Sequence, residues 1–161
     1  MTMFASLLLL LTETFPATIR DPGFTRGLDH WRTAGHRNYR AAPGSNYPAR
    51  PARRWLSVGW AARYRPPGDA EYRVFTIVDA RRYRGRLVCF SAAIRTPGRG
   101  ARLVAVTRGA SARHDLYASD GWDRQGVNFH VPRDADTIEV GFRLRGGGGL
   151  DADDVRLTVL R

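Results

Sequence analysis

Hydrophobic and polar residues alternate along three short segments in the second half of this chain, 126–131, 137–145 and 154–160. Successive side chains of a β-strand point to opposite faces, so a period of two predicts strands with one buried face and one polar face. The predicted buried set is Val127, Phe129, Val131, Ile138, Val140, Phe142, Leu144, Val155, Leu157 and Val159.

The segments 86–95 and 101–108 are also of strand length, but they are apolar on both faces. In the first, Val88 and Phe90 point to one side while Leu87 and Cys89 point to the other. A strand of this kind lies between two layers or lines an apolar cavity. The leucine-rich run from Phe4 to Leu11 is a candidate cover for the second face. Both interpretations stay open.

Turn residues separate these segments from one another and from a further predicted strand over 72–79. No stretch has the pattern of an amphipathic helix, and regularly spaced short strands predict a sandwich or barrel. The length of 161 residues suits one domain. The turn signals are Asp21-Pro22-Gly23, Pro66-Pro67-Gly68-Asp69, Thr96-Pro97-Gly98 and Gly146-Gly147-Gly148-Gly149.

The first 20 residues are predicted to be an apolar extension of a domain that runs from 21 to 161. Phe4 to Leu11 is too short to span a bilayer. It resembles the apolar region of a signal peptide, but no positive charge precedes it, and Phe15-Pro16-Ala17 departs from a cleavage site. The alternative is an added strand over 6–12. We therefore expect no stable membrane span and favour a cytoplasmic location over secretion.

The net charge is +11, and all 26 basic residues are arginine. Because arginine has GC-rich codons and lysine does not, the absence of lysine points to coding bias rather than selection for an acidic partner. We therefore expect no nucleic-acid partner. The single cysteine, Cys89, excludes an intramolecular disulfide.

Three stretches of the chain together carry a family resemblance. They are Asp21-Pro22-Gly23-Phe24 followed by Gly27 to Trp31, then Tyr83 to Ala92, and then Gly121-Trp122 through Val131-Pro132 to Asp153-Asp154-Val155. In this order and spacing they resemble the galactose-binding-like carbohydrate-binding modules. The resemblance implies an all-β fold, a jelly-roll β-sandwich of two antiparallel sheets. It also implies non-catalytic binding of a glycan or similar small molecule on the concave face.

Carbohydrate sites combine aromatic platforms with polar groups that reach sugar hydroxyls. The polar face of the predicted strands and the aromatic residues near it supply such groups. Trp31 and Trp122 occupy positions that define the fold in this family, and the core is the favoured place for both. The candidate ligand-binding residues are Trp60, Tyr72, Tyr117, Trp122, Asn128, His130, Glu139 and Arg143.

A structural calcium ion is the one cofactor that the resemblance suggests. Members of that family often have a glutamate after the opening Phe, and this glutamate binds the calcium ion together with an aspartate of the last strand. Here that position is Thr25, while Asp153 and Asp154 remain as candidate ligands. Calcium takes six to eight oxygen ligands, and only part of such a set is visible.

A catalytic alternative stays open, although the sequence has no nucleophile elbow, zinc-protease motif or phosphate-binding loop. If Glu139 and His130 lie on adjacent strands of one face, they form an acid/base pair in an apolar cleft. That arrangement would fit a stand-alone cyclase or isomerase of a bacterial natural-product pathway.

Overall fold

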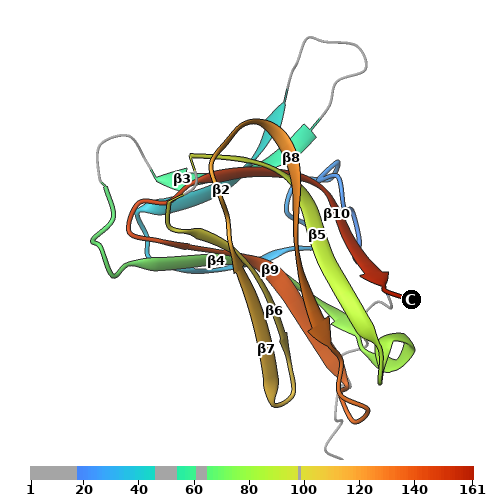
Figure 1. Ribbon diagram of the computed structural model, residues 1–161. Coiled ribbons are helices and arrows are strands. Elements are labelled where there is room, and N and C mark those ends of the chain that lie inside the picture. Colours follow the sequence, from blue (N-terminus) through green and yellow to red (C-terminus); the bar gives the residue numbers. More distant parts are fainter. Residues whose placement is uncertain (1–17, 46–53, 61–64, 98) are drawn as a thin grey trace, which may run out of the picture.

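Two antiparallel sheets of five strands each pack face to face in the computed structural model, which describes residues 18–45, 54–60, 65–97 and 99–161 (Figure 1). Sheet A has the order β1 (Arg32–Gly35), β4 (Glu71–Asp79), β9 (Thr137–Arg145), β6 (Ala101–Thr107), β7 (Ala110–Asp115). Sheet B has the order β2 (Tyr39–Ser45), β3 (Arg54–Trp60), β10 (Leu150–Val159), β5 (Leu87–Thr96), β8 (Ser119–His130). A short 3-10 helix, η1 (Arg81–Tyr83), precedes β5. The predicted jelly-roll sandwich is confirmed.

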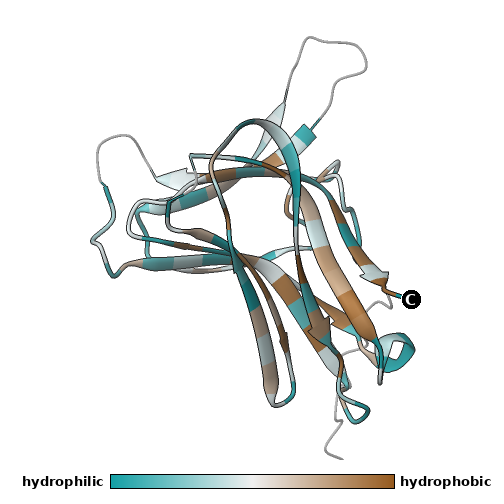
Figure 2. Ribbon diagram, viewed as in Figure 1, coloured by the Kyte–Doolittle hydropathy of each residue, from teal (hydrophilic) through white to brown (hydrophobic). Residues whose placement is uncertain are grey.

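The core lies between the sheets and follows the predicted alternation. The inward side chains of β9, from Ile138 to Leu144, are at most 1% exposed, and those of β5, from Val88 to Ile94, are fully buried. Figure 2 shows the hydrophobic stretches on these central strands. Two predicted core residues of β10, Leu157 and Val159, are only half-buried, although both pack against the core.

The segment before β1 closes one side of the sandwich. Its Asp21 turn, sealed by the Phe24 N–H on the Asp21 carbonyl oxygen at 3.1 Å, directs Phe24 inward. The Phe24 ring lies 5.0 Å from that of Trp31, which in turn stacks on Phe142 of sheet A at 6.1 Å. Trp31 is 6% exposed, so its predicted place in the core is confirmed.

The two strands that are apolar on both faces are β5 and β6, each the second strand from one edge of its sheet. Their second faces form part of the outer surfaces of the sandwich, where Leu87, Cys89, Val104 and Val106 are half-buried. The predicted cover for this apolar side, the leucine run 4–11, lies outside the described residues, as does most of the predicted extension 1–20. Within the described part of the chain, no helix is long and apolar enough to cross a membrane.

Candidate functional site

Two tryptophans meet across the outer face of sheet B. Trp55 of β3 and Trp122 of β8 stand on strands three positions apart, about 14 Å at the usual strand spacing. Their rings nevertheless approach to 6.0 Å between centroids, at an interplanar angle of 72°. The two indoles therefore lean toward each other over the strands between them. Trp122 is 40% exposed, so its predicted place in the core is wrong.

A guanidinium group lies close to both of these indoles. The Cζ atom of Arg95 is 5.1 Å from the ring centroid of Trp122 and 5.8 Å from that of Trp55. Asp151 stands directly opposite on β10, and its Oδ2 accepts hydrogen bonds from Nε and Nη2 of Arg95 at 3.1 and 2.6 Å. This ion pair fixes the guanidinium. Within the described residues Oδ1 of Asp151 accepts no hydrogen bond, so the carboxylate can still accept one from a hydroxyl group.

Backbone features of the neighbouring strands support this cluster. Trp55 faces Gly44 of β2, and its indole occupies the space where a side chain at Gly44 would stand. A larger residue at position 44 would displace the ring. The outward positions of β5 carry small residues such as Ala93 and Ser91, so no large side chain there fills the space beneath the two indoles.

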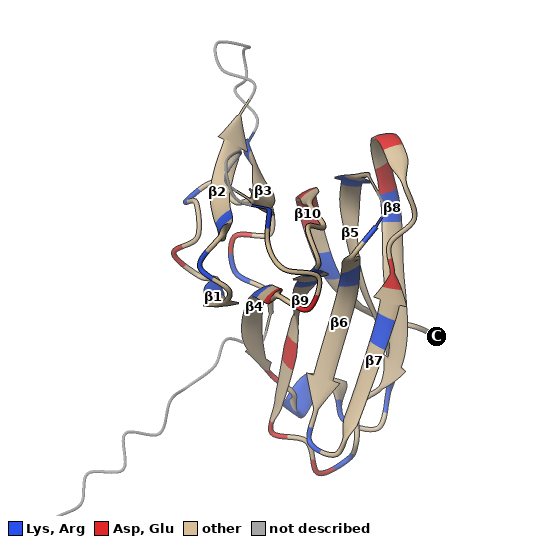
Figure 3. Ribbon diagram, turned by 90° about the vertical axis from the view of Figure 1, so that its left-hand side faces the viewer, with Lys and Arg blue, Asp and Glu red and all other residues tan. Residues whose placement is uncertain are grey.

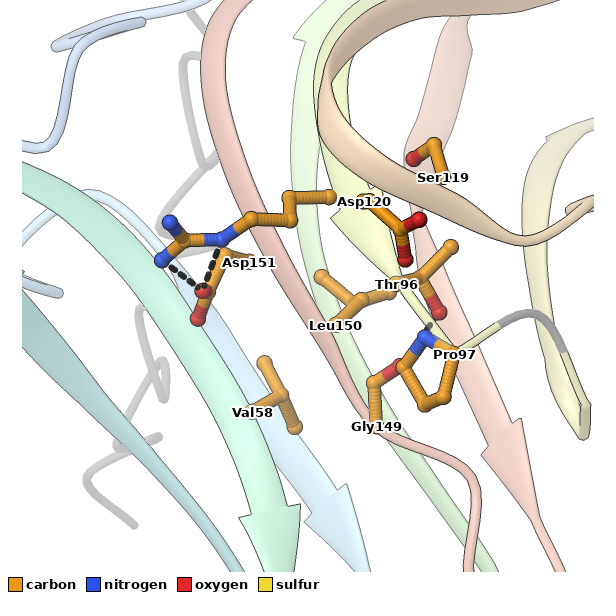
Figure 4. Close-up of a pocket in the computed structure, with 9 residues that line it drawn as sticks. Val58, Thr96, Pro97, Ser119, Asp120, Gly149, Leu150 and Asp151 are labelled. Atoms are coloured by element: carbon orange, nitrogen blue, oxygen red, sulfur yellow. Dashed lines mark hydrogen bonds and ion pairs between the residues drawn. The ribbon is translucent and has the colours of Figure 1, made fainter.

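A pocket of about 440 Å³ opens beside the Arg95–Asp151 pair (Figure 4). Asp120 and Ser119 lie on the β8 side of it, while Val58 and Leu150 supply apolar wall. The Thr96 hydroxyl donates to the Gly149 carbonyl oxygen at 2.6 Å, which ties the two strand ends together at the rim. This volume lies in the range of small-molecule sites, and its lining mixes carboxylates, a guanidinium and aliphatic groups.

A buried amide holds the loop before β8. Gln125 is 3% exposed, and its side chain both accepts the Tyr117 N–H and donates to the Tyr117 carbonyl oxygen, each at 3.2 Å. The Tyr117 hydroxyl donates to Asp123 at 2.6 Å, and this hydrogen bond raises the pKa of the phenol. Tyr117 is 52% exposed, so its ring stands at the surface near the β8 end of the face.

The structure separates the predicted polar residues into two groups. Asn128 and His130 are exposed on β8 in sheet B, whereas Glu139 and Arg143 lie on the outer face of β9 in sheet A. The inward faces of both strands carry the core, so these side chains point away from each other on opposite sides of the sandwich. The acid/base pair of Glu139 and His130 is therefore not formed, because β8 and β9 are not adjacent strands of one sheet.

Two predicted aromatic residues also lie away from the Trp55–Trp122 pair. Tyr72 points inward from β4 and stacks on Tyr39 at 5.5 Å. Tyr39 is 1% exposed, and its hydroxyl accepts the Gly147 N–H at 2.9 Å, so this pair packs between the sheets. Trp60 ends β3 opposite Tyr39 and is 39% exposed. It is on the opposite side of its strand from Trp55 by the alternation of side chains.

The carboxylates suggested for calcium do not fit that ion. Asp154 lies in a bulge of β10 and binds two guanidinium groups, those of Arg124 and Arg156. Burial raises the pKa of this carboxyl, but the Arg156 hydrogen bond and the two positive charges lower it overall. Asp153 is buried and accepts the Asp154 N–H. Among the described residues, no group of three or more His, Cys, Asp or Glu side chains is arranged to hold a metal.

His130 lines a smaller pocket, of about 220 Å³, between the edge strands of the two sheets. Its other lining residues come from β6, β7 and β8 and are mostly small or apolar, namely Ala105, Thr107, Ala110, Ser111, Ala112 and Phe129. Among the described residues, no carboxylate lines this pocket. It therefore lacks the second group that the catalytic alternative requires.

Three members of the observed cluster, Trp55, Arg95 and Asp151, are absent from the sequence prediction. The alternation of Leu56 and Val58 inward places Trp55 outward, but the segment 54–60 was not predicted as a strand. Arg95 is an outward residue at the end of a predicted strand, and Asp151 lies two residues before Asp153, a candidate calcium ligand. Extending the alternation of inward and outward residues along each strand would have placed all three side chains on the outer face.

Several known structures share this architecture. The enzymatically active domain of bacteriophage CBA120 tailspike protein 4 matches 89% of the chain with a TM-score of 0.68 and 12% sequence identity. The CBM22-1–GH10 modules of the Clostridium thermocellum endo-1,4-beta-D-xylanase 10B, complexed with xylohexaose, match 89% of the chain with a TM-score of 0.58 and 15% sequence identity. TmCBM61 in complex with beta-1,4-galactotriose matches 89% of the chain with a TM-score of 0.55 and 12% sequence identity.

The chain spans 22% of the tailspike chain and 29% of the xylanase chain, but 99% of TmCBM61. At these identities the likeness establishes a common fold, and the predicted resemblance to carbohydrate-binding modules is confirmed at that level. No protein-family model matches the sequence, and no curated protein matches it.

Proposed function

We propose that this domain binds carbohydrate, without catalysis, on the outer face of sheet B. The observation that carries the proposal is the Trp55–Trp122 pair with Arg95 and Asp151 between its strands. Aromatic faces pack against the C–H groups of a sugar ring, while carboxylate and guanidinium groups pair with its hydroxyls. The cluster supplies both within one surface.

The pocket beside the cluster extends the surface available to a saccharide. A hydroxyl group can donate to Asp151 or Asp120, and Arg95 retains N–H groups that can donate to a ring or glycosidic oxygen. Val58 and Leu150 offer apolar contact deeper in the pocket. We therefore infer that one sugar unit lies in the pocket and the next one lies against Trp122.

The fold likeness supports this proposal independently of the side chains. Two of the matched structures hold xylohexaose or beta-1,4-galactotriose. These two oligosaccharides are the first probes to use. A glycan array then extends the search to other sugars.

Tryptophan substitutions test the proposal, with a matched control inside the chain. Trp122→Ala and Trp55→Ala are expected to weaken oligosaccharide binding at least about tenfold, measured by calorimetric titration. Trp60→Ala serves as the control because Trp60 and Trp122 are equally exposed, at 39% and 40%, but Trp60 lies outside the cluster. Its affinity should equal that of the unsubstituted protein.

The result that overturns the proposal is an array and titration series with no saccharide bound by the unsubstituted protein. Equal affinity in Trp55→Ala, Trp122→Ala and the unsubstituted protein would overturn the location. Thermal unfolding of each variant checks that the fold is retained.

A further inference from the structure

Three arginines lie in one row across the outer face of sheet A. Arg73 of β4 stands directly opposite Arg143 of β9, which stands directly opposite Arg102 of β6. Figure 3 shows these three strands side by side. Residues paired in this way have Cβ atoms about 4.5–5.5 Å apart, and like charges at that spacing destabilise a sheet. The row therefore needs negative charge nearby.

In the described part of the chain, the two outer members of the row have acidic partners and the central one has none. Nη1 of Arg73 donates to Glu139 at 3.0 Å, and its guanidinium lies 4.4 Å from the Phe75 ring centroid. Nε of Arg102 lies 3.1 Å from a carboxylate oxygen of Asp115. Within the described part of the chain, Arg143 forms no hydrogen bond or ion pair. Its positive charge is uncompensated between two others.

A pocket of about 200 Å³ opens next to Arg73 and Arg143. Its remaining lining comes from β1 and the start of β4, where small residues leave the space open, and consists of Ala34, Gly35, Glu71 and Tyr72. One water occupies about 30 Å³ in the liquid, so the pocket has room for a small oxyanion with part of its hydration shell. Glu71 is exposed and stands opposite Arg145, two register positions from the Arg73–Arg143 pair.

We propose that Arg73 and Arg143 form a binding site for an oxyanion group, such as a sulfate, a phosphate or a carboxylate. A guanidinium presents several N–H donors in a planar fork, and two neighbouring forks can share one oxyanion. Glu139 and Phe75 hold the Arg73 fork in place, while the Arg143 fork has all its donors available. The bound anion also removes the repulsion along the row. This site lies on the opposite sheet from the proposed saccharide surface and does not depend on it.

Thermal shift with simple salts tests the proposal. Sodium sulfate, phosphate and acetate are each compared with sodium chloride at equal ionic strength, because specific binding raises the melting temperature beyond general screening. At least one of the three is expected to exceed chloride. Arg143→Gln should bind that anion about tenfold more weakly or worse, as expected for a lost charge-assisted hydrogen bond.

Two further variants separate a site from a change in net charge. Arg108→Gln removes one exposed arginine from the turn between β6 and β7 and should keep the anion response. Arg143→Lys keeps the charge but lacks the fork, so it should bind more weakly than the unsubstituted protein. In chloride alone, Arg143→Gln should melt no lower than the unsubstituted protein, because the substitution relieves repulsion.

The source of the anion is distinguished by comparing galactose 6-sulfate with free sulfate and with galactose. Tighter binding of the ester than of free sulfate assigns the site to an anionic saccharide, and equal binding assigns it to the free ion. The proposal is overturned if none of the three salts exceeds chloride, or if Arg143→Gln responds to anions as the unsubstituted protein does.

Discussion

Gly44→Ala should disturb the proposed saccharide surface while leaving the fold intact. A Cβ atom at position 44 would lie 2.5 Å from Cε2 and 2.9 Å from Cδ1 of Trp55, and nearer still to Nε1. Ordinary carbon contacts are about 3.5–4.0 Å, so the indole must move by about 1 Å. Position 44 is in a strand and does not have a positive φ, so alanine fits the backbone there.

Displacing the ring separates Trp55 from Trp122 and Arg95. Aromatic contacts of this kind contribute about 0.5–1.5 kcal/mol, which corresponds to a loss of roughly two- to tenfold in oligosaccharide affinity. Near-ultraviolet circular dichroism reports the geometry of the tryptophan pair without any ligand, and calorimetric titration reports the affinity. The melting temperature should stay equal or rise slightly, because alanine is favoured over glycine within a strand by about 0.5–1 kcal/mol.

Gly59→Ala is the matched control. Gly59 is an outward residue of β3, two positions beyond Ser57, and a Cβ atom there meets nothing within 4 Å. It should leave both the dichroism and the affinity unchanged. If Gly44→Ala gives the dichroism and affinity of Gly59→Ala, the contact between Gly44 and Trp55 does not position the ring, and the reasoning fails.

Two other substitutions test side chains that stabilise sheet B. Gln125→Leu should lower the free energy of unfolding by about 1–3 kcal/mol in urea titration, because the Tyr117 backbone loses both hydrogen bonds to the buried amide; an unchanged midpoint contradicts this. The pKa of Asp154 is lowered below its ordinary 3.8, so its contribution to stability is present above that pH and is lost as the pH falls through the folded-state pKa. Asp154→Asn should therefore lose less melting temperature than the unsubstituted protein between pH 5 and pH 2.5, and Asn accepts the positive φ of this position. Equal losses would show that the carboxylate contributes nothing.

The central strands were predictable because they are long and their buried faces are regular. The segment 137–145 was predicted with the bounds of β9, and 86–95 and 101–108 agree with β5 and β6 within a residue. The edge strands β1, β2 and β7 were missed. Their sequences are rich in small and polar residues, and β2 contains Pro43 and Gly44, which usually indicate turns. Edge strands bury little side-chain surface, so their pairing leaves a weak signal in the sequence.

The assembly of the candidate site was not predictable from alternation. Alternation assigns each residue to a face of its own strand, but it does not assign strands to sheets. Asn128 and Glu139 both read as outward residues of neighbouring strands in the sequence, and the turn between β8 and β9 carries the chain from one sheet to the other. A hairpin would have brought their faces together. The crossover sends them to opposite surfaces.

The register also gives the arginine content a meaning that composition does not. On sheet B, Arg95 pairs with Asp151, while Arg124 and Arg156 share Asp154, so each of these three guanidinium groups contacts a carboxylate. On sheet A the same residue type stands three times in a row, and within the described residues only Arg73 and Arg102 contact a carboxylate, whereas Arg143 contacts none. Coding bias is our explanation for arginine in place of lysine throughout the chain, but it does not explain this local imbalance. We therefore expect anion binding to follow position 143 rather than net charge, so that removing Arg108 and removing Arg143 have different effects.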